Sequence, residues 1–205
     1  MKDFAARFDA PLTTSRPRGA RQLEARSPKL GRRLRLFDHL AFSQWIRLEA
    51  DPAVLTFCER PTRISRQPDS CLIDFWVQRA GSQAMLLLES RYDLALQDVN
   101  GVAVEVVSLA ELAAARVWVS NWSRMLPVIN ATQALLPKGL IKRVCDRIQE
   151  PTPLAHVERD LAVGDPAILR GAIFELLRTG RLRAPSLHHQ PLDLHLMVGD
   201  RKSVV

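Results

Sequence analysis

The segment that most constrains the fold is residues 84–89, AMLLLE, an almost wholly apolar run in the middle of the chain. Such a run is typical of a strand that is buried on both faces at the centre of a sheet. Strands are also expected on either side of it along the chain, at residues 71–78 (CLIDFWVQ) and 102–107 (VAVEVV). The turn residues Ala80-Gly81-Ser82 predict a hairpin between the first of these strands and the central one. The middle of the chain is therefore expected to form a sheet.

Helices are expected before and after this sheet. Asp38 can cap a helix that extends to about residue 49, and the pair Asp51-Pro52 ends it. Ser108 has Glu111 three residues later, which is the spacing of a capping box, and predicts a helix from residue 108 to about 117. Short strands are expected at residues 53–57 and 62–65. This order of elements predicts an α/β fold.

The last third of the chain has a different order of expected elements, with helices first and strands after them. Asp165 is a suitable N-cap, Pro166 suits the first position of a helix, and Gly180 suits its C-terminal end. Three helices followed by two strands are the layout of a winged-helix domain, which we expect over residues 138–200, with residues 121–137 as a linker. The expected helices span residues 138–148, 153–161 and 166–178, and the strands span residues 181–184 and 192–198.

Positive charge is concentrated at the beginning of the chain. Residues 1–36 hold ten Lys and Arg against three Asp and Glu, which matches the net charge of +7 of all 205 residues. We expect residues 1–26 to be a flexible basic arm whose natural partner is a polyanion, with nucleic acid favoured. Alternatively, the arm only keeps the protein soluble. It can also reflect a GC-rich genome that encodes Arg in preference to Lys, since the chain has 24 Arg and 5 Lys. The expected DNA contacts are Arg16, Arg18, Arg21, Arg26, Lys29, Arg32, Arg33 and Arg35, with Arg170, Arg181 and Arg183 in the winged-helix domain.

Two carboxylates are the candidate chemical site. Asp74 lies on the expected strand 71–78, and the next strand ends at Glu89, followed by Ser90 and Arg91. Two carboxylates on neighbouring strands can hold a divalent metal ion such as Mg²⁺, while a nearby cation steadies the attacking water or the scissile phosphate. A site of this kind hydrolyses phosphodiesters, with Asp74 and Glu89 as metal ligands and Arg91 as the catalytic cation. The alternative is that both acids are ordinary solvated residues at the ends of strands.

The segment from Ser27 to Ile64 and the two strands after it resemble the TnsA family, the endonuclease subunits of heteromeric bacterial transposases. The shared features are a Ser and Gly-Arg lead-in, Asp51-Pro52-x-Val54, Glu59-Arg60-Pro61, Ile73-Asp74-Phe75, and Glu89-Ser90-Arg91 in place of Glu-x-Lys. The resemblance implies a restriction-endonuclease-like mixed sheet flanked by helices over residues 27–120, followed by a small winged-helix domain. It also implies metal-dependent cutting of DNA at transposon ends, beside a DDE transposase subunit and an ATPase regulator.

The sequence departs from the pattern of this family at three places. The family has a metal-binding Glu on the first helix, where this chain offers Ala41 or Phe42. Arg91 replaces a Lys, and a planar guanidinium is not a compact point charge. Ten residues separate Arg91 from Val102, too few for the long helix that the family usually has there. Two functions follow: an endonuclease whose Mg²⁺-dependent activity is weakened or lost, or a catalytically inactive DNA-binding and assembly subunit.

Other classes of function have little support in the sequence. Cys58, Cys71 and Cys145 are an odd number at wide spacings, which matches neither a disulfide framework nor a zinc knuckle. Neither the G-x-G-x-x-G nor the G-x-x-x-x-G-K-[ST] motif of nucleotide-binding proteins is present. No run of eighteen apolar residues or secretory signal is present, so a cytoplasmic protein without a membrane partner is expected.

Overall fold

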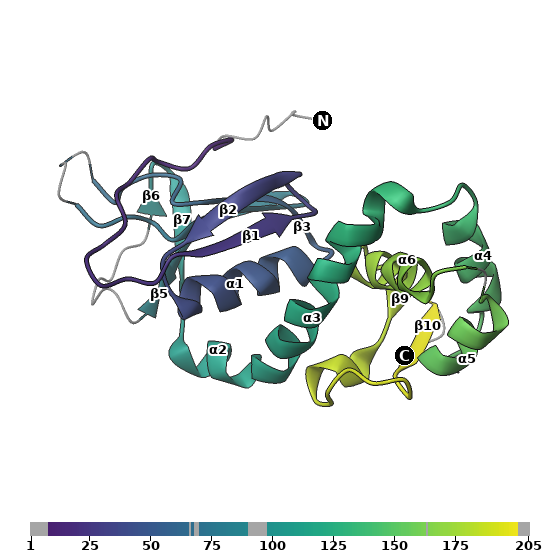
Figure 1. Ribbon diagram of the computed structural model, residues 1–205. Coiled ribbons are helices and arrows are strands. Elements are labelled where there is room, and N and C mark those ends of the chain that lie inside the picture. Colours follow the sequence, from purple (N-terminus) through teal and green to yellow (C-terminus); the bar gives the residue numbers. More distant parts are fainter. Residues whose placement is uncertain (1–7, 66, 68–69, 90–97, 163, 201–205) are drawn as a thin grey trace. The chain divides into compact units, whose positions relative to one another are not determined.

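The computed structural model describes residues 8–65, 67, 70–89, 98–162 and 164–200, and it divides into two compact units (Figure 1). Unit 1 consists of Met1–Glu49 and Ala53–Ala114, and unit 2 consists of Ala50–Pro52 and Ala115–Val205. Among the described residues, none of the helices has both the length and the apolar character needed to cross a bilayer.

The core of unit 1 is a five-stranded mixed sheet in the order β3-β4-β5-β7-β6. Strand β4 is antiparallel to both β3 and β5, β7 is parallel to β5, and β6 is antiparallel to β7. The expected central strand is confirmed, because β5 has neighbours on both sides and is buried from Ala84 to Leu88. The strands span Val54–Glu59 (β3), Phe75–Arg79 (β4), Ser82–Leu88 (β5), Asp98–Val99 (β6) and Val102–Val107 (β7). The strand expected at residues 62–65 is reduced to a single bridge between Arg63 and Leu72.

Two helices of unit 1 begin at the expected caps. The Asp38 carboxylate accepts a 2.7 Å hydrogen bond from the Ala41 N–H at the start of α1 (His39–Ala50). Ser108 and Glu111 form the expected capping box before α2 (Leu109–Ala114), because each accepts the backbone N–H of the other at 3.0 Å. The expected α/β class is confirmed as a mixed sheet with helices beside it.

A hairpin occupies part of the sequence where a flexible arm was expected. Strands β1 (Leu23–Ser27) and β2 (Arg32–Leu36) pair antiparallel, and they lie side by side in Figure 1. Leu34 and Leu36 are buried and alternate with exposed Arg33 and Arg35. One face of the hairpin therefore has apolar surface to bury, and this burial favours strands despite the dense positive charge.

The chain that precedes the hairpin also contacts the sheet. The Phe8 ring lies 5.5 Å from the Trp76 ring between centroids, and the Leu12 N–H donates to the Arg60 carbonyl at 2.9 Å. The stretch that carries Arg16, Arg18 and Arg21 is therefore held at both ends, by these contacts and by β1.

Within the described residues, unit 2 contains four helices, two 3-10 turns and a small sheet. Helix α3 (Arg116–Thr132) and the turn η2 (Gln133–Leu135) occupy most of the segment where a linker was expected. Trp122, Met125, Leu126 and Ile129 on α3 are buried, so this segment forms part of the core of the unit. The other helices are α4 (Leu140–Arg147), α5 (Leu154–Asp160) and α6 (Pro166–Arg178).

The small sheet of unit 2 has the strand order β8-β10-β9, with both pairs antiparallel. Both expected strands are present in shortened or shifted form, and a further strand, β8, was not expected. Asp165 caps α6 as expected, by accepting a 2.8 Å hydrogen bond from the Ala167 N–H. The strands span Thr152–Pro153 (β8), Leu182–Arg183 (β9) and Met197–Asp200 (β10), and the 3-10 turn η3 (Pro185–His188) lies between β9 and β10.

Candidate functional site

Asp74 lies immediately before β4 and is fixed by bonds to two neighbouring segments. Its backbone N–H donates to the Leu86 carbonyl at 3.1 Å, and its carbonyl accepts the Arg60 N–H at 2.9 Å. Its side chain is 4% exposed and accepts the backbone N–H of Leu88 at 2.8 Å. The carboxylate is therefore held at the last residue of β5, one residue before Glu89.

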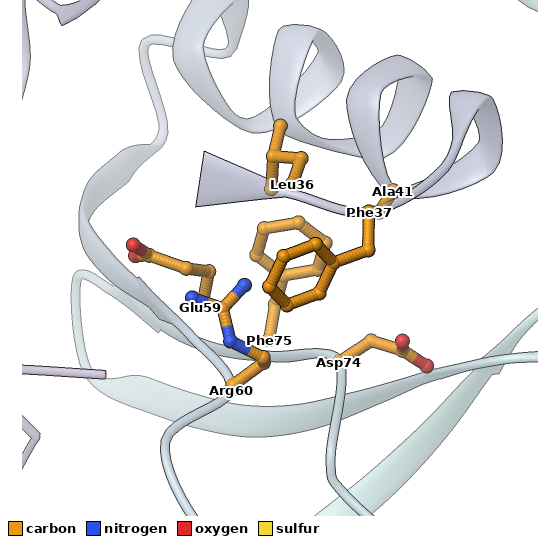
Figure 2. Close-up of a pocket in the computed structure, with 7 residues that line it drawn as sticks. All are labelled: Leu36, Phe37, Ala41, Glu59, Arg60, Asp74 and Phe75. Carbon is orange, nitrogen blue, oxygen red and sulfur yellow. The ribbon is translucent and has the colours of Figure 1, made fainter. Parts of the chain in front are cut away.

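Asp74 is one of the residues that line a small pocket (Figure 2). The volume of the pocket is about 20 Å³, which is room for about one water molecule. Ala41, in the first turn of α1, lines this pocket together with Asp74. Of Ala41 and Phe42, the two residues that stand where the family resemblance implies a metal-binding Glu, Ala41 lines this pocket and offers only a methyl group. The other lining residues are Leu36, Phe37, Glu59, Arg60 and Phe75.

Burial changes the acidity of Asp74. The loss of solvent around the carboxylate raises its pKa from 3.8 to about 7, and the Leu88 N–H partly opposes this rise. The carboxyl group therefore carries a proton in much of the folded protein near neutral pH.

Asp74→Asn is expected to flatten the pH dependence of stability. Between pH 3.8 and about 7, the folded protein keeps a proton on Asp74 that the unfolded chain has lost. The free energy of unfolding of the native protein therefore falls as the pH rises through this window, by about 4 kcal/mol in total, and it levels off above the folded-state pKa. The Asn variant lacks this decline and should be the more stable protein at pH 8. Urea unfolding of both proteins between pH 4 and pH 8 measures the difference, and parallel curves would contradict the assignment.

Glu89, the second candidate ligand, follows β5 and is exposed. Its carboxylate accepts the backbone N–H of Leu109, the first residue of α2, at 3.0 Å. The structure thus brings the Asp74 carboxylate to the residue before Glu89, while the Glu89 carboxylate bonds to the start of α2. Arg91, the expected catalytic cation, lies outside the described residues.

The side chains around Asp74 do not make a complete metal centre. Mg²⁺ requires about six oxygen ligands in near-octahedral geometry and is usually held by carboxylates, waters and substrate phosphates. Ala41 contributes no oxygen ligand at the helix position that lines the pocket with Asp74. Within the part of the chain that the structure describes, no three His, Cys, Asp or Glu side chains form a group that could hold a metal ion.

A buried ion pair beside the pocket was not expected from the sequence. Glu59, at the end of β3, is 2% exposed, and both of its carboxylate oxygens accept from the Arg32 guanidinium, at 2.8 and 2.6 Å. Arg60 has a φ of 47° and places its guanidinium 4.9 Å from the centre of the Phe37 ring, where it donates to the Arg35 carbonyl. These contacts fasten the β1–β2 hairpin to the sheet. Only the alternation of Arg and Leu in RRLRL could have indicated that Arg32 points inward.

A second set of buried contacts anchors the turn of the hairpin. Glu49 is fully buried at the end of α1 and accepts from the Ser27 hydroxyl at 2.5 Å and the Lys29 N–H at 2.7 Å. The Lys29 ammonium donates to the carbonyls of Leu48 and Val54, both at 2.8 Å. Lys29 and Arg32, both expected to contact DNA, are therefore engaged within unit 1.

The remaining basic candidates fall into two groups. Arg170 is partly buried and forms a two-bond ion pair with Glu158, through its Nε and through its Nη2 at 2.8 Å. The others are exposed: Arg16, Arg18, Arg21, Arg26, Arg33 and Arg35 in unit 1, and Arg181 and Arg183 in unit 2. The exposed basic surface that could bind a polyanion is therefore smaller than the number of basic residues in the sequence indicates.

Comparison with known proteins adds no assignment to this geometry. No protein-family model matches the sequence, and no curated protein matches it significantly. Two features of the chain bear on its function: the pocket lined by Asp74 and Ala41, and the exposed arginines of unit 1.

Proposed function

We propose that the chain is a TnsA-like DNA-binding subunit of a transposition complex, in which the endonuclease site has lost metal-dependent hydrolysis. The observation that carries this proposal is the methyl group of Ala41 in the Asp74 pocket. A nuclease that uses Asp74 needs oxygen ligands and open space there, and this pocket holds about one water. The exposed arginines of unit 1 do not line that pocket, and they are the residues proposed to contact DNA.

The architecture of both units supports this proposal. The run α1, β3, β4, β5 followed by β7, parallel to β5, agrees with a restriction-endonuclease-like sheet flanked by helices. In unit 2, helices α4, α5 and α6 are followed by β9 and β10, and β8 completes the sheet, which agrees with a winged helix. The partners implied by the resemblance, a DDE transposase and an ATPase regulator, belong to the proposal.

The second candidate is an active Mg²⁺-dependent endonuclease. It is favoured by one observation: the Asp74 carboxylate bonds to Leu88, so the two candidate metal ligands come from adjoining strand ends. In that case Asp74 and Glu89 hold Mg²⁺, and Arg91 steadies the scissile phosphate.

Two assays with the same purified protein separate the candidates. For the DNA-binding subunit, we expect a labelled DNA duplex to be bound and supercoiled plasmid to remain intact with Mg²⁺ or Mn²⁺, alone or with a neighbouring transposase. Metal-dependent nicking that disappears in both Asp74→Asn and Glu89→Gln would overturn the proposal in favour of the active nuclease. Failure to bind the duplex would overturn both candidates.

Ala41→Glu is expected to create a metal-dependent stabilisation that the native protein lacks. The new carboxylate stands beside Asp74 and lowers the melting temperature in EDTA, because two buried acids repel each other. About 1 mM Mn²⁺ should then raise the melting temperature by several degrees, because the ion binds only the folded state. Ala41→Gln has nearly the same size without the charge and should respond to Mn²⁺ no more than the native protein. Equal responses in all three proteins would show that the pocket is not a former metal site.

A further inference from the structure

The outward face of the β1–β2 hairpin carries three arginines on a regular ladder. Successive side chains of a strand point to opposite faces, so Arg33 and Arg35 point away from buried Leu34 and Leu36. On β1 the exposed residues are Glu24 and Arg26. The register places Arg26 opposite Arg33 and Glu24 opposite Arg35.

This arrangement does not stabilise the hairpin by itself. Like charges directly opposite each other in an antiparallel pair are destabilising, and this is the relation of Arg26 to Arg33. Arg35 Nε lies 3.6 Å from Glu24 Oε1, and the two side chains are 71% and 49% exposed. Ion pairs this exposed contribute little to the stability of the fold. A polyanion bound to this face would offset the repulsion between Arg26 and Arg33. Its negative charges would also be attracted to all three guanidinium groups.

The hairpin is also rigidly held from its inner face. Arg32 is bonded to Glu59, Ser27 to Glu49, and the Arg35 carbonyl to Arg60. The three outward arginines therefore stand on a backbone that is fixed before any ligand arrives. A surface that is fixed in advance loses less conformational entropy on binding.

Helix α6 of unit 2 is mostly buried, and its arginines form ion pairs. A recognition helix in the major groove needs side chains that are free to reach the bases. Both arginines of α6 are committed: Arg170 to Glu158, and Arg178, which is 9% exposed, to Glu175. Most of the helix is buried, at Leu169, Gly171, Ala172, Ile173, Phe174, Leu176, Leu177 and Arg178.

From the exposure and register of these arginines on a fixed hairpin we infer that the chain binds the phosphate backbone of duplex DNA on the outward face of the β1–β2 hairpin, through Arg26, Arg33 and Arg35. We do not expect it to read DNA with α6, whose arginines are bonded to acidic side chains. The inference rests on the proposed DNA-binding function and assigns it to a surface. Phosphate contacts carry no base information, so this face contributes affinity and orientation without sequence preference.

The test compares two full-length triple variants with equal loss of charge. One is Arg26→Gln/Arg33→Gln/Arg35→Gln, and the control is Arg116→Gln/Arg143→Gln/Arg159→Gln, which removes three exposed arginines of unit 2 that are not among the expected DNA contacts. Fluorescence anisotropy with a labelled duplex measures Kd between about 50 and 200 mM salt. The hairpin variant should bind roughly 100-fold more weakly near 0.1 M salt, and the slope of log K against log salt should become shallower by about 3. The control should stay within about threefold of the native protein in affinity.

The remaining outcomes are distinguishable. An equal loss in both variants, or a larger loss in the control, overturns the hairpin assignment and leaves the DNA-binding function standing. If the native protein binds no duplex, the proposed function itself fails, and this inference fails with it. If the hairpin variant binds DNA normally but no longer binds the transposase, the face is a protein-docking surface and the inference is wrong. Melting curves check that both variants are folded, and the hairpin variant should melt within a few degrees of the native protein, because exposed pairs such as Arg35–Glu24 contribute little to stability.

Discussion

Gly171→Ala is expected to destabilise unit 2 by about 2–4 kcal/mol, although Ala is the better helix former. A Cβ at this position of α6 would stand 1.9 Å from the Thr132 hydroxyl oxygen, 2.9 Å from its Cβ and 3.3 Å from its Cγ2. Thr132 is itself buried, and its hydroxyl donates to the Val128 carbonyl, so turning the side chain away from the new Cβ would break this bond. The two helices would have to separate to admit the methyl group, and packing around them would be lost. Thermal and urea unfolding measure the effect.

A double variant identifies the cause. In a Thr132→Ala background, the hydroxyl and methyl groups that meet the new Cβ are gone and only the Thr132 Cβ contact remains. Gly171→Ala should therefore cost about 1–2 kcal/mol less in that background than in the native protein. Strictly additive costs would show that α3 and α6 do not approach each other this closely.

Asn121→Leu is expected to cost about 3–5 kcal/mol, because one buried side chain satisfies three backbone groups. Its amide group donates to the carbonyls of Leu187 and Gln190, and its oxygen accepts the Leu192 N–H, all at 2.8 Å. Leu fills a similar volume but leaves these groups without their partner, at a cost of about 1–3 kcal/mol each when water cannot replace it. Hydrogen exchange at the Leu192 amide, together with the melting temperature, measures the loss.

Ser123→Ala on the same helix is the matched control. The Ser123 hydroxyl donates to the Ser120 carbonyl at 2.7 Å, but it does so at the surface, where water can take its place. This change should alter the free energy of unfolding by less than about 0.5 kcal/mol. If Asn121→Leu cost as little as this, the conformation of residues 187–192 would not depend on their hydrogen bonds to Asn121 of α3.

The elements that the sequence predicted well are those with a local signal. The apolar run 84–89 is the central strand, and the caps at Asp38, Ser108 and Asp165 all make their expected bonds. Each of these signals lies within a few residues of the element that it defines, so no knowledge of distant contacts is needed.

The parts that were missed depend on contacts between distant segments. Nothing near Arg32 indicates Glu59, which is 27 residues away, and nothing near Asn121 indicates a loop 66 or more residues away. Residues 1–26 were therefore predicted to be a flexible arm, although residues 23–26 belong to β1, which pairs with β2. At the candidate site, the sequence predicted the two strands beside Asp74 and Glu89, but it placed both acids inside them, whereas Asp74 precedes β4 and Glu89 follows β5. It also did not predict the burial that raises the pKa of Asp74 to about 7.

The path of the chain limits how its two units could have been assembled in evolution. Unit 2 includes Ala50–Pro52, three residues that lie in the middle of the sequence of unit 1. A Cβ on Gly180 would stand 2.8 Å from the Pro52 Cβ, so Pro52 fills space within unit 2. A gene segment that begins after Ala114 would encode unit 2 without this piece. The two units are therefore expected to be inherited together and not exchanged as separate cassettes between unrelated genes.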